Sequence, residues 1–176
     1  TNRHCHSRQA CAEEIKLNAD GTFTQAEVTS CGLNGGPLEG KGEYEARIAC
    51  NLMSKKGVKF YTCKTPAGIH PYFTQSGGDR ECDGDQYIAN FSDGATAGFK
   101  YFKFENAKII SVKIRGKAKG EMLVFGKEKK EVAKIKIDVD GGTKEFSSLL
   151  NIADGVSPLY FTFRGKGKFD FFSFEL

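Results

Sequence analysis

Alternation of apolar and polar residues is the main pattern in the second half of the chain. Three stretches alternate almost without interruption, at 108–115, 133–140 and 159–164. Because successive side chains of a strand point to opposite faces, a period of two predicts half-buried β-strands. The inward-facing residues expected from the first and third stretches are Ile110, Val112, Ile114, Leu159, Phe161 and Phe163.

The last strand expected from this pattern carries apolar residues on both sides. Strict alternation puts Phe172, Phe174 and Leu176 on one face, with Phe169 and Phe171 on the other. A strand of this kind is covered on both faces or touches a neighbouring domain.

Glycine-containing breaks separate the expected strands at short intervals. Turns are predicted at 93–94, 115–116, 141–142, 154–155 and 165–167. Short strands with regular turns favour an all-β sandwich or barrel. Only 9–16 and 146–152 could form short helical turns, and neither is long enough for a helical layer.

The first forty residues differ from the rest. Residues 9–17 and 22–29 read as two strands joined by a hairpin-like turn at 18–21, and a Gly/Pro-rich connection follows at 30–38. So small a unit cannot fold alone. We expect it to pack on the main body as an added β layer, or to belong to another domain.

Composition excludes several classes of protein. The chain has 176 residues, 39% hydrophobic and 27% charged, which is a normal globular balance. No apolar run reaches the roughly 18–20 residues of a membrane-spanning helix. A net charge of +4 is too small to indicate nucleic-acid binding, and the basic residues at 113, 115, 117 and 119 are typical of a solvated strand face. Fifteen Phe can build a sandwich core, and there is no Trp.

Six cysteines lie in the first half, at 5, 11, 31, 50, 63 and 82. Their even number favours an oxidising compartment, while free buried thiols stay open at this chain length. The run His4-Cys5-His6 lacks the second pair of close-spaced ligands found in structural zinc sites. It is also the sole support for an independent Cys/His enzyme.

Two groups of motifs resemble known families. Residues 8–13, 18–22 and 27–32 resemble the last propeller-blade hairpin of family 43 glycoside hydrolases. The second group resembles the β-sandwich of carbohydrate-binding modules of family 6, at 70–75, 87–91, 93–102 and 159–163. The resemblance implies a propeller tail or linker at 1–40 and a jelly-roll-type β-sandwich at 41–176, so the predicted fold is all-β with an N-terminal β-hairpin appendage.

The function implied by this resemblance is non-catalytic binding of hemicellulose, of the xylan or arabinoxylan type, beside the parent's catalytic propeller. The family's catalytic carboxylates lie on blades outside this sequence. Glu13 and Glu14 are adjacent, so on a strand they face opposite ways and cannot form the acid–base pair of glycoside hydrolysis. Arg8 resembles an arginine of the parent active site, with a surface ion pair as the alternative. We do not expect nucleic-acid or membrane partners. We expect an extracellular location, with a cytoplasmic one as the alternative.

The resemblance also places candidate sugar-binding residues. In the loop-edge cleft of family 6 modules, Tyr87 takes the place of the first aromatic, Thr143 that of the second with Phe146 nearby, and Lys168 that of the asparagine. Two of these elements depart from the family pattern. A structural accessory domain that docks on the propeller without binding sugar alone is therefore the alternative function.

Other tyrosines are candidates elsewhere. Tyr101 and Tyr160 could serve a second cleft on the concave sheet face, or simply pack across strands. Tyr72, beside Pro71 and Phe73, could form a loop platform or plug the end of the sandwich.

Family 6 modules often hold a structural calcium ion between the first and last strands. Asp170 fits the last-strand ligand, and Glu45 fits the first-strand ligand unless another register places Cys50 there. Carboxylate and carbonyl oxygens are the ligands that calcium requires.

Overall fold

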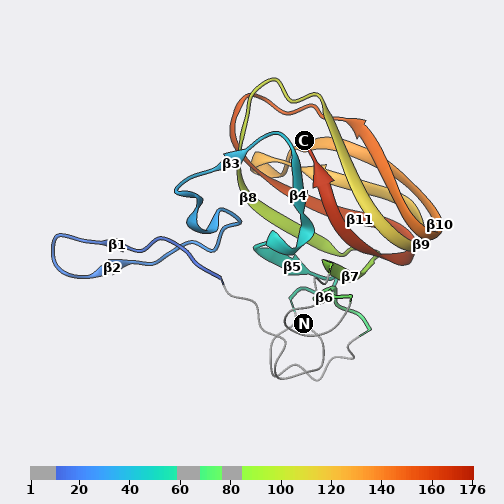
Figure 1. Cartoon of the computed structure of the whole chain (residues 1–176), viewed down its shortest axis with the longest axis horizontal. Coiled ribbons are helices and arrows are strands. Elements are labelled where there is room, and N and C mark those ends of the chain that lie inside the picture. The colour runs from blue at the N-terminus through green and yellow to red at the C-terminus, as the bar shows by residue number, and fades with distance from the viewer. Residues whose placement is uncertain (1–10, 59–67, 77–84) are drawn as a thin grey trace.

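The computed structural model describes residues 11–58, 68–76 and 85–176 (Figure 1). Almost all of its regular structure is β, which confirms the predicted fold class. The strands are β1 (Lys16–Leu17), β2 (Phe23–Thr24), β3 (Leu38–Glu39), β4 (Glu43–Glu45), β5 (Asn51–Met53), β6 (Tyr72–Gln75), β7 (Gln86–Ser92), β8 (Thr96–Phe104), β9 (Ile109–Phe125), β10 (Glu131–Leu149) and β11 (Gly155–Glu175). Three short 3-10 helices accompany them, η1 (Gly32–Asn34), η2 (Ala46–Ile48) and η3 (Lys127–Lys129). In the described part of the chain, no helix has the length and apolarity to cross a bilayer.

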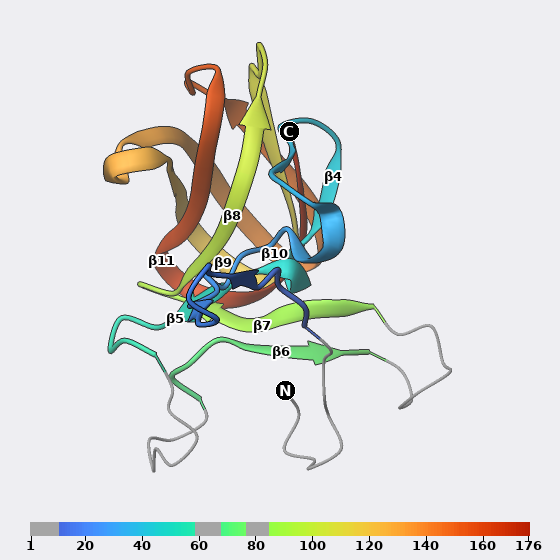
Figure 2. The same cartoon turned by 90° about the vertical axis from the view of Figure 1, so that its left-hand side faces the viewer.

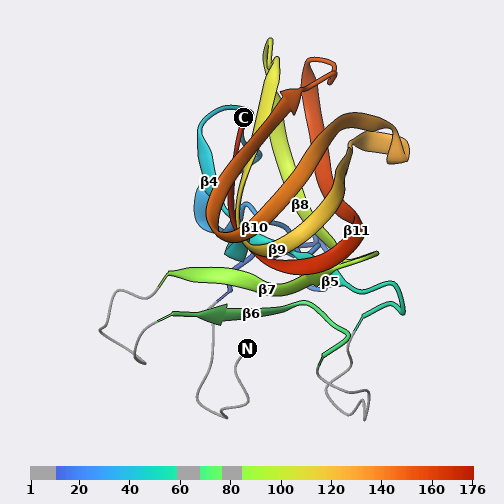
Figure 3. The ribbon, with the colours of Figure 1, turned by 90° about the vertical axis from the view of Figure 1, so that its right-hand side faces the viewer.

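The sandwich is one hydrogen-bonded sheet that folds over on itself. Strand β11 pairs with β8 through its first half, at 155–162, and with β7 and then β4 through its second half, at 168–175. Strand β9 follows β11 along the opposite edge, and β10 follows β9. The three long strands therefore belong to both layers and curve around the core, while β6 and β7 cross β8 steeply (Figures 2 and 3).

Glycines mark the corner where the long strands change layer. A Cβ at Gly116 would lie 2.7 Å from the Lys168 carbonyl oxygen, and φ of Gly116 is 150°, so another residue would be strained at this close approach. The turns predicted at 115–116, 141–142 and 165–167 are therefore wrong: these glycines bend continuous strands. The predicted helical turn at 146–152 is also wrong, because β10 continues to Leu149.

Phenylalanine fills the core, as its abundance predicted. The largest fully buried side chains include Phe91, Phe99, Phe102, Phe104, Phe161, Phe163, Phe169, Phe171 and Phe174. Each buried ring of this kind stabilises the fold by roughly 1.5–3 kcal/mol relative to an exposed one.

The predicted facing of the last strand is wrong at one point. A β-bulge lies between Phe171 and Ser173, where β11 shifts register against β9. The extra residue puts Phe174 on the same side as Phe169 and Phe171, and all three are at most 2% exposed. Phe172 is left on the outer face.

The N-terminal hairpin projects from the body of the sandwich (Figure 1). Its turn is closed by Asn18 N donating to Thr22 O at 2.8 Å, with Gly21 at φ 83°. The hairpin is shorter than predicted, two residues in each strand.

The segment after the hairpin covers an edge of β8. The backbone of β8 bonds in turn to β5 at 96–98, to Ser30 at Lys100, and to β3 at 102–103. The segment therefore extends the sheet sideways instead of adding the expected β layer. An edge covered in this way is protected from pairing with other chains.

Candidate functional site

Tyr87 lies on the outer side of β7 beneath two other side chains. The Arg115 guanidinium is 5.1 Å from the centre of the Tyr87 ring and 4.8 Å from that of Phe172, and the two ring centres are 4.7 Å apart. Arg115 Nη2 also donates to Asp170 Oδ2 at 3.0 Å. Tyr87 is only 9% exposed, so its ring face is not open for stacking on a sugar.

The structure separates two of the other loop-edge candidates, Phe146 and Lys168, along strand β9. Phe146 is opposite Val112 and packs against the core, whereas Lys168 is opposite Lys117 and exposed. Val112 and Lys117 lie on one strand, roughly 16 Å apart at about 3.3 Å per residue. Thr143 is exposed on β10, opposite Arg115. The cleft implied by the resemblance is therefore not assembled from these side chains.

The carboxylates predicted to bind calcium are paired with arginines. Asp170 accepts from Arg115, and Glu45 forms an ion pair with Arg47. Calcium takes six to eight oxygen ligands. The described residues contain no group of three or more His, Cys, Asp or Glu side chains that could hold a metal ion. These two paired carboxylates do not form a calcium donor set, and calcium binding stays a prediction.

Tyr72 lies on β6, opposite Ala89, and is half-buried. Its neighbour Pro71 is buried, and Phe73 packs against the core. This setting favours the interpretation of residues 71–73 as a plug of the sandwich end.

Tyr160 lies on the outer face of β11, where its ring crosses Gly98 of β8. A Cβ at Gly98 would lie 2.7 Å from both Cδ1 and Cε1 of Tyr160 and 3.1 Å from the Asn51 Cβ. Gly98 is opposite Tyr160 in the antiparallel register. Two pairs further along and on the same face, Thr96 and Thr162 bring their hydroxyl oxygens to 2.9 Å. The absence of a side chain at Gly98 thus lets a half-buried aromatic ring lie across the sheet.

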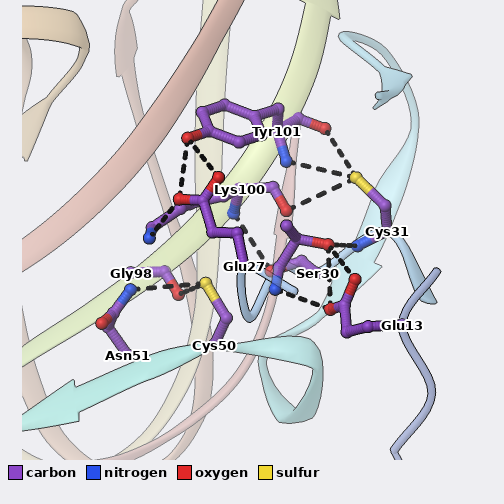
Figure 4. A network of polar contacts seen from close by, with 10 residues as sticks. Glu13, Glu27, Ser30, Cys31, Cys50, Asn51, Gly98, Lys100 and Tyr101 are labelled. Atoms are coloured by element: carbon purple, nitrogen blue, oxygen red, sulfur yellow. Dashed lines mark hydrogen bonds and ion pairs between the residues drawn. The ribbon is translucent and has the colours of Figure 1, made fainter. Parts of the chain in front are cut away.

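Tyr101 and Lys100 continue this face along β8 and share one carboxylate. Glu27 Oε1 accepts from Lys100 Nζ at 2.9 Å and from the Tyr101 hydroxyl at 3.0 Å (Figure 4). The hydrogen bonds from Lys100 and Tyr101 lower the pKa of Glu27. Burial and then the bond to Glu27 raise the pKa of Tyr101, and the bond to Glu27 raises that of Lys100. Tyr160 is close enough to contribute to both of these pKa shifts.

The segment that carries Glu27 is tied to β8 by further bonds. Lys100 N donates to Ser30 Oγ at 3.1 Å, and Tyr101 N to Cys31 Sγ at 3.4 Å. Glu13, from the first arm of the hairpin, accepts from Thr29 N at 2.6 Å. Sequence reasoning missed Glu27 and Asn51, because nothing in a single sequence signals contacts between segments 73 residues apart.

Several predictions concern thiols, histidines and Arg8. Arg8 and His4-Cys5-His6 lie outside the described residues, as do Cys63 and Cys82. The thiols of Cys31 and Cys50 donate to backbone carbonyls, those of Lys100 at 3.5 Å and Gly98 at 3.4 Å. Burial raises the pKa of the Cys50 thiol, which makes a nucleophilic role for it unfavourable.

The basic face predicted on β9 is largely neutralised by its neighbours. Lys117 pairs with Asp140 at 2.8 Å, and Lys119 with Asp138 at 2.9 Å. These exposed cross-strand pairs are what a solvated strand face provides.

A similar protein of named function covers the whole chain. A xylosidase/arabinosidase from Thermoclostridium stercorarium is 43% identical over 183 residues, and the match takes in 100% of this chain and 38% of that protein. The chain thus spans about two fifths of the length of this relative. No family model matches the chain.

Solved structures share the fold at low sequence identity. A glycoside hydrolase family 43 arabinoxylan arabinofuranohydrolase from Bacillus subtilis, solved with cellotetraose, gives a TM-score of 0.63 at 16% identity, covering 93% of this chain and 32% of that one. The module CsCBM6-3 from Clostridium stercorarium, solved with cellobiose, gives a TM-score of 0.61 at 13% identity, covering 80% of this chain and 96% of that one. A family 6 module from Clostridium cellulolyticum, solved with xylose, gives a TM-score of 0.59 at 9% identity, covering 78% of this chain and 98% of that one. These likenesses confirm the resemblance and the sandwich fold inferred from the sequence.

Proposed function

Since the chain is similar to the C-terminal part of a family 43 glycoside hydrolase with a family 6-like sandwich, we propose that it is the non-catalytic, hemicellulose-binding part of such an enzyme. Residues 1–40 would then be the tail of the catalytic propeller and its linker, and 41–176 the binding module. The match to the arabinofuranohydrolase covers 93% of the chain, against 80% for an isolated module, which supports this division. Action on a plant polysaccharide implies an extracellular location.

The surface that we assign to carbohydrate is the outer face around Tyr160 and Tyr101, not the cleft at Tyr87. The observation that carries this is the Tyr160 ring lying across Gly98. A flat aromatic ring buries the apolar face of a pyranose, while polar groups at its rim satisfy the hydroxyls. Lys100, Glu27 and Asn51 supply an ammonium, a carboxylate and an amide beside it.

Xylan or arabinoxylan is the ligand class that the relatives favour. The curated relative is named a xylosidase/arabinosidase, and the family 43 structure is named an arabinoxylan arabinofuranohydrolase. A module joined to such an enzyme would hold it on the same polysaccharide and so raise the local substrate concentration.

Calorimetric titration of the chain with xylan, arabinoxylan and β-glucan oligosaccharides tests the proposal. We expect binding, strongest for the xylan types, and at least a roughly tenfold loss of affinity in Tyr160→Ala, equivalent to about 1.4 kcal/mol. Tyr72→Ala, a tyrosine on the distant edge strand β6, should leave the affinity unchanged. A wild-type chain that is folded but binds none of them at millimolar sugar would contradict the proposal.

A structural accessory role is the second candidate, and the hairpin supports it. Ile15, Leu17 and Phe23 are 62%, 67% and 68% exposed, and the last two are paired across the hairpin. Exposed apolar groups gathered in this way mark an interaction surface, here for the parent propeller. Absence of sugar binding would favour this role, and turnover of an aryl glycoside by the chain alone would overturn both.

A further inference from the structure

Glu27 contacts the Tyr160 face from a part of the chain outside the proposed module. It lies 73 and 74 residues before Lys100 and Tyr101, yet its carboxylate bonds to both side chains. Both carboxylate oxygens accept from the Tyr101 hydroxyl, at 3.0 and 3.1 Å. A phenol bonded in this way has its ring orientation fixed by the carboxylate.

The charge of Lys100 depends on the same contact. The Lys100 side chain is only 18% exposed, and its ion-pair partner in the structure is Glu27. A lysine stem packed along the surface in this way leaves its ammonium group at the rim, where a counter-charge holds it in place. Without Glu27, we expect the lysine side chain to turn outward, away from the position it holds near Tyr160.

The backbone holds Glu27 at this place. Ser30 and Cys31 occupy the stretch of the β8 edge between β5 and β3, and bond to Lys100 and Tyr101 there. Glu13 ties Thr29 back to the first arm of the hairpin. The position of Glu27 is therefore set by the bonds that Ser30 and Cys31 make to the edge of β8 and by the bond between Glu13 and Thr29 within the appendage (Figure 4).

We propose that the carbohydrate-binding surface is shared between segment 27–31 and the sandwich, with Glu27 as the positioning residue that orients Tyr101 and Lys100 beside Tyr160. This rests on the proposed function of the Tyr160 face. Sugar affinity would then depend on the docking of the appendage, so that the binding surface is complete only when the preceding part of the chain is in place.

The shared surface predicts a pH dependence. The pKa of Glu27 is lowered in the folded chain by Lys100 and Tyr101, so the contact is fully present above the ordinary glutamate pKa and is lost as the pH falls through the lowered value. The groups bonded to the Glu27 carboxylate are Lys100 and Tyr101, and both stay protonated throughout that range. Wild-type affinity should therefore begin to decline only below the ordinary glutamate pKa of 4.5.

The experiment compares Glu27→Ala and Glu27→Gln with Glu14→Gln in the full chain. Glu14 is an exposed glutamate of the same appendage, so its change controls for loss of a negative charge. Affinity for an arabinoxylan oligosaccharide is measured by calorimetry from pH 3.5 to 7, with thermal unfolding in parallel. We expect Glu27→Ala to weaken binding about fivefold or more at pH 7, and Glu27→Gln to lose the acid-side decline.

A further variant separates positioning from folding. Tyr101→Phe keeps the ring and removes the hydroxyl that bonds to Glu27, so its effect on affinity and that of Glu27→Ala should be less than additive in the double variant. A merely structural role would lower the unfolding temperature and leave affinity and pH profile unchanged. If the wild-type chain binds the oligosaccharide and Glu27→Ala binds it equally tightly, this inference is overturned and the proposed function stands. Absence of wild-type binding overturns both it and the proposed function.

Discussion

Tyr87 and Tyr160 occupy comparable outward positions on neighbouring parts of one folded sheet, but Tyr87 is buried whereas Tyr160 is partly exposed. At Tyr87 the adjacent strands supply Arg115 and Phe172, which cover the ring. At Tyr160 the adjacent strand supplies Gly98, and the ring lies flat across it. The residue across the strand pair, and not the tyrosine itself, decides whether an aromatic group is a support or a platform.

The two environments also differ in how charge is used. Arg115 is held between two rings and Asp170, so its cation serves the fold. Lys100 and Glu27 lie at the rim of the Tyr160 face, where the Glu27 side chain is 53% exposed and its carboxylate can accept from ligand hydroxyls while it stays bonded to Lys100 and Tyr101. We therefore expect substitutions at the first site to change stability and those at the second to change binding.

The largest expected effect is that of Tyr87→Ala on stability. Removing a buried aromatic side chain costs about 3–5 kcal/mol, and the cavity would also leave Arg115 without one of its rings. Urea unfolding measures this, and Tyr160→Ala is the matched change at the half-buried ring, with a cost of about 1 kcal/mol. Equal losses of unfolding free energy in the two variants would contradict the claim that Tyr87 supports the fold more than Tyr160 does.

Gly98→Ala tests whether the Tyr160 ring needs the absence of a side chain on the adjacent strand. The added methyl group would meet the Tyr160 ring at 2.7 Å, so the ring must move. We expect a loss of about 1–3 kcal/mol in stability, as for other overpacked sites, and a loss of sugar affinity in the folded variant. At Gly36 a Cβ would meet nothing within 4 Å, so Gly36→Ala is the control. Unchanged sugar affinity in Gly98→Ala would argue against the Tyr160 platform.

Arg115→Ala removes the cover of Tyr87 without removing the ring. The cation–π contact contributes at least about 0.5–1 kcal/mol and the partly buried ion pair up to about 1 kcal/mol, so we expect a loss of about 1–2 kcal/mol. Thermal unfolding with Arg164→Ala, an exposed arginine of β11, as control measures it. A gain of sugar binding at the uncovered Tyr87 would show that Arg115 alone closes that cleft.

The smallest effect is expected at the paired lysines of β9. The Lys119 and Asp138 side chains are 79% and 66% exposed, and solvent and salt screen such a pair. Lys119→Ala should leave the unfolding midpoint and the sugar affinity unchanged. A clear change in affinity would indicate that the basic face of β9 takes part in binding.

Much of the sandwich could be predicted from the sequence, because period-two alternation is a local property. The faces of Ile110, Val112 and Ile114 are confirmed, with all three fully buried. The bulge after Phe171 could not be predicted, since it depends on the register against β9. Glycines predicted to make turns instead bend long strands, because their role is set by the neighbouring strand.

The candidate site was less predictable than the fold. Tyr101 and Tyr160 could be singled out by resemblance, but their environment rests on Gly98 and Glu27, which lie on other segments. The covering of Tyr87 depends on Arg115, which in the sequence is indistinguishable from the solvated lysines beside it. Contacts between segments far apart in the chain determine the environment of both tyrosines, and such contacts cannot be predicted from the pattern of a single sequence.

The most direct test of the central claim is a nuclear magnetic resonance titration of the chain with a xylo-oligosaccharide. Amide and aromatic-ring signals report separately on the two tyrosine environments at once. We expect shifts of the signals of Gly98, Lys100, Tyr101 and Tyr160, with those of Tyr87, Arg115 and Phe172 unchanged. Shifts confined to Tyr87, Arg115 and Phe172 would contradict it.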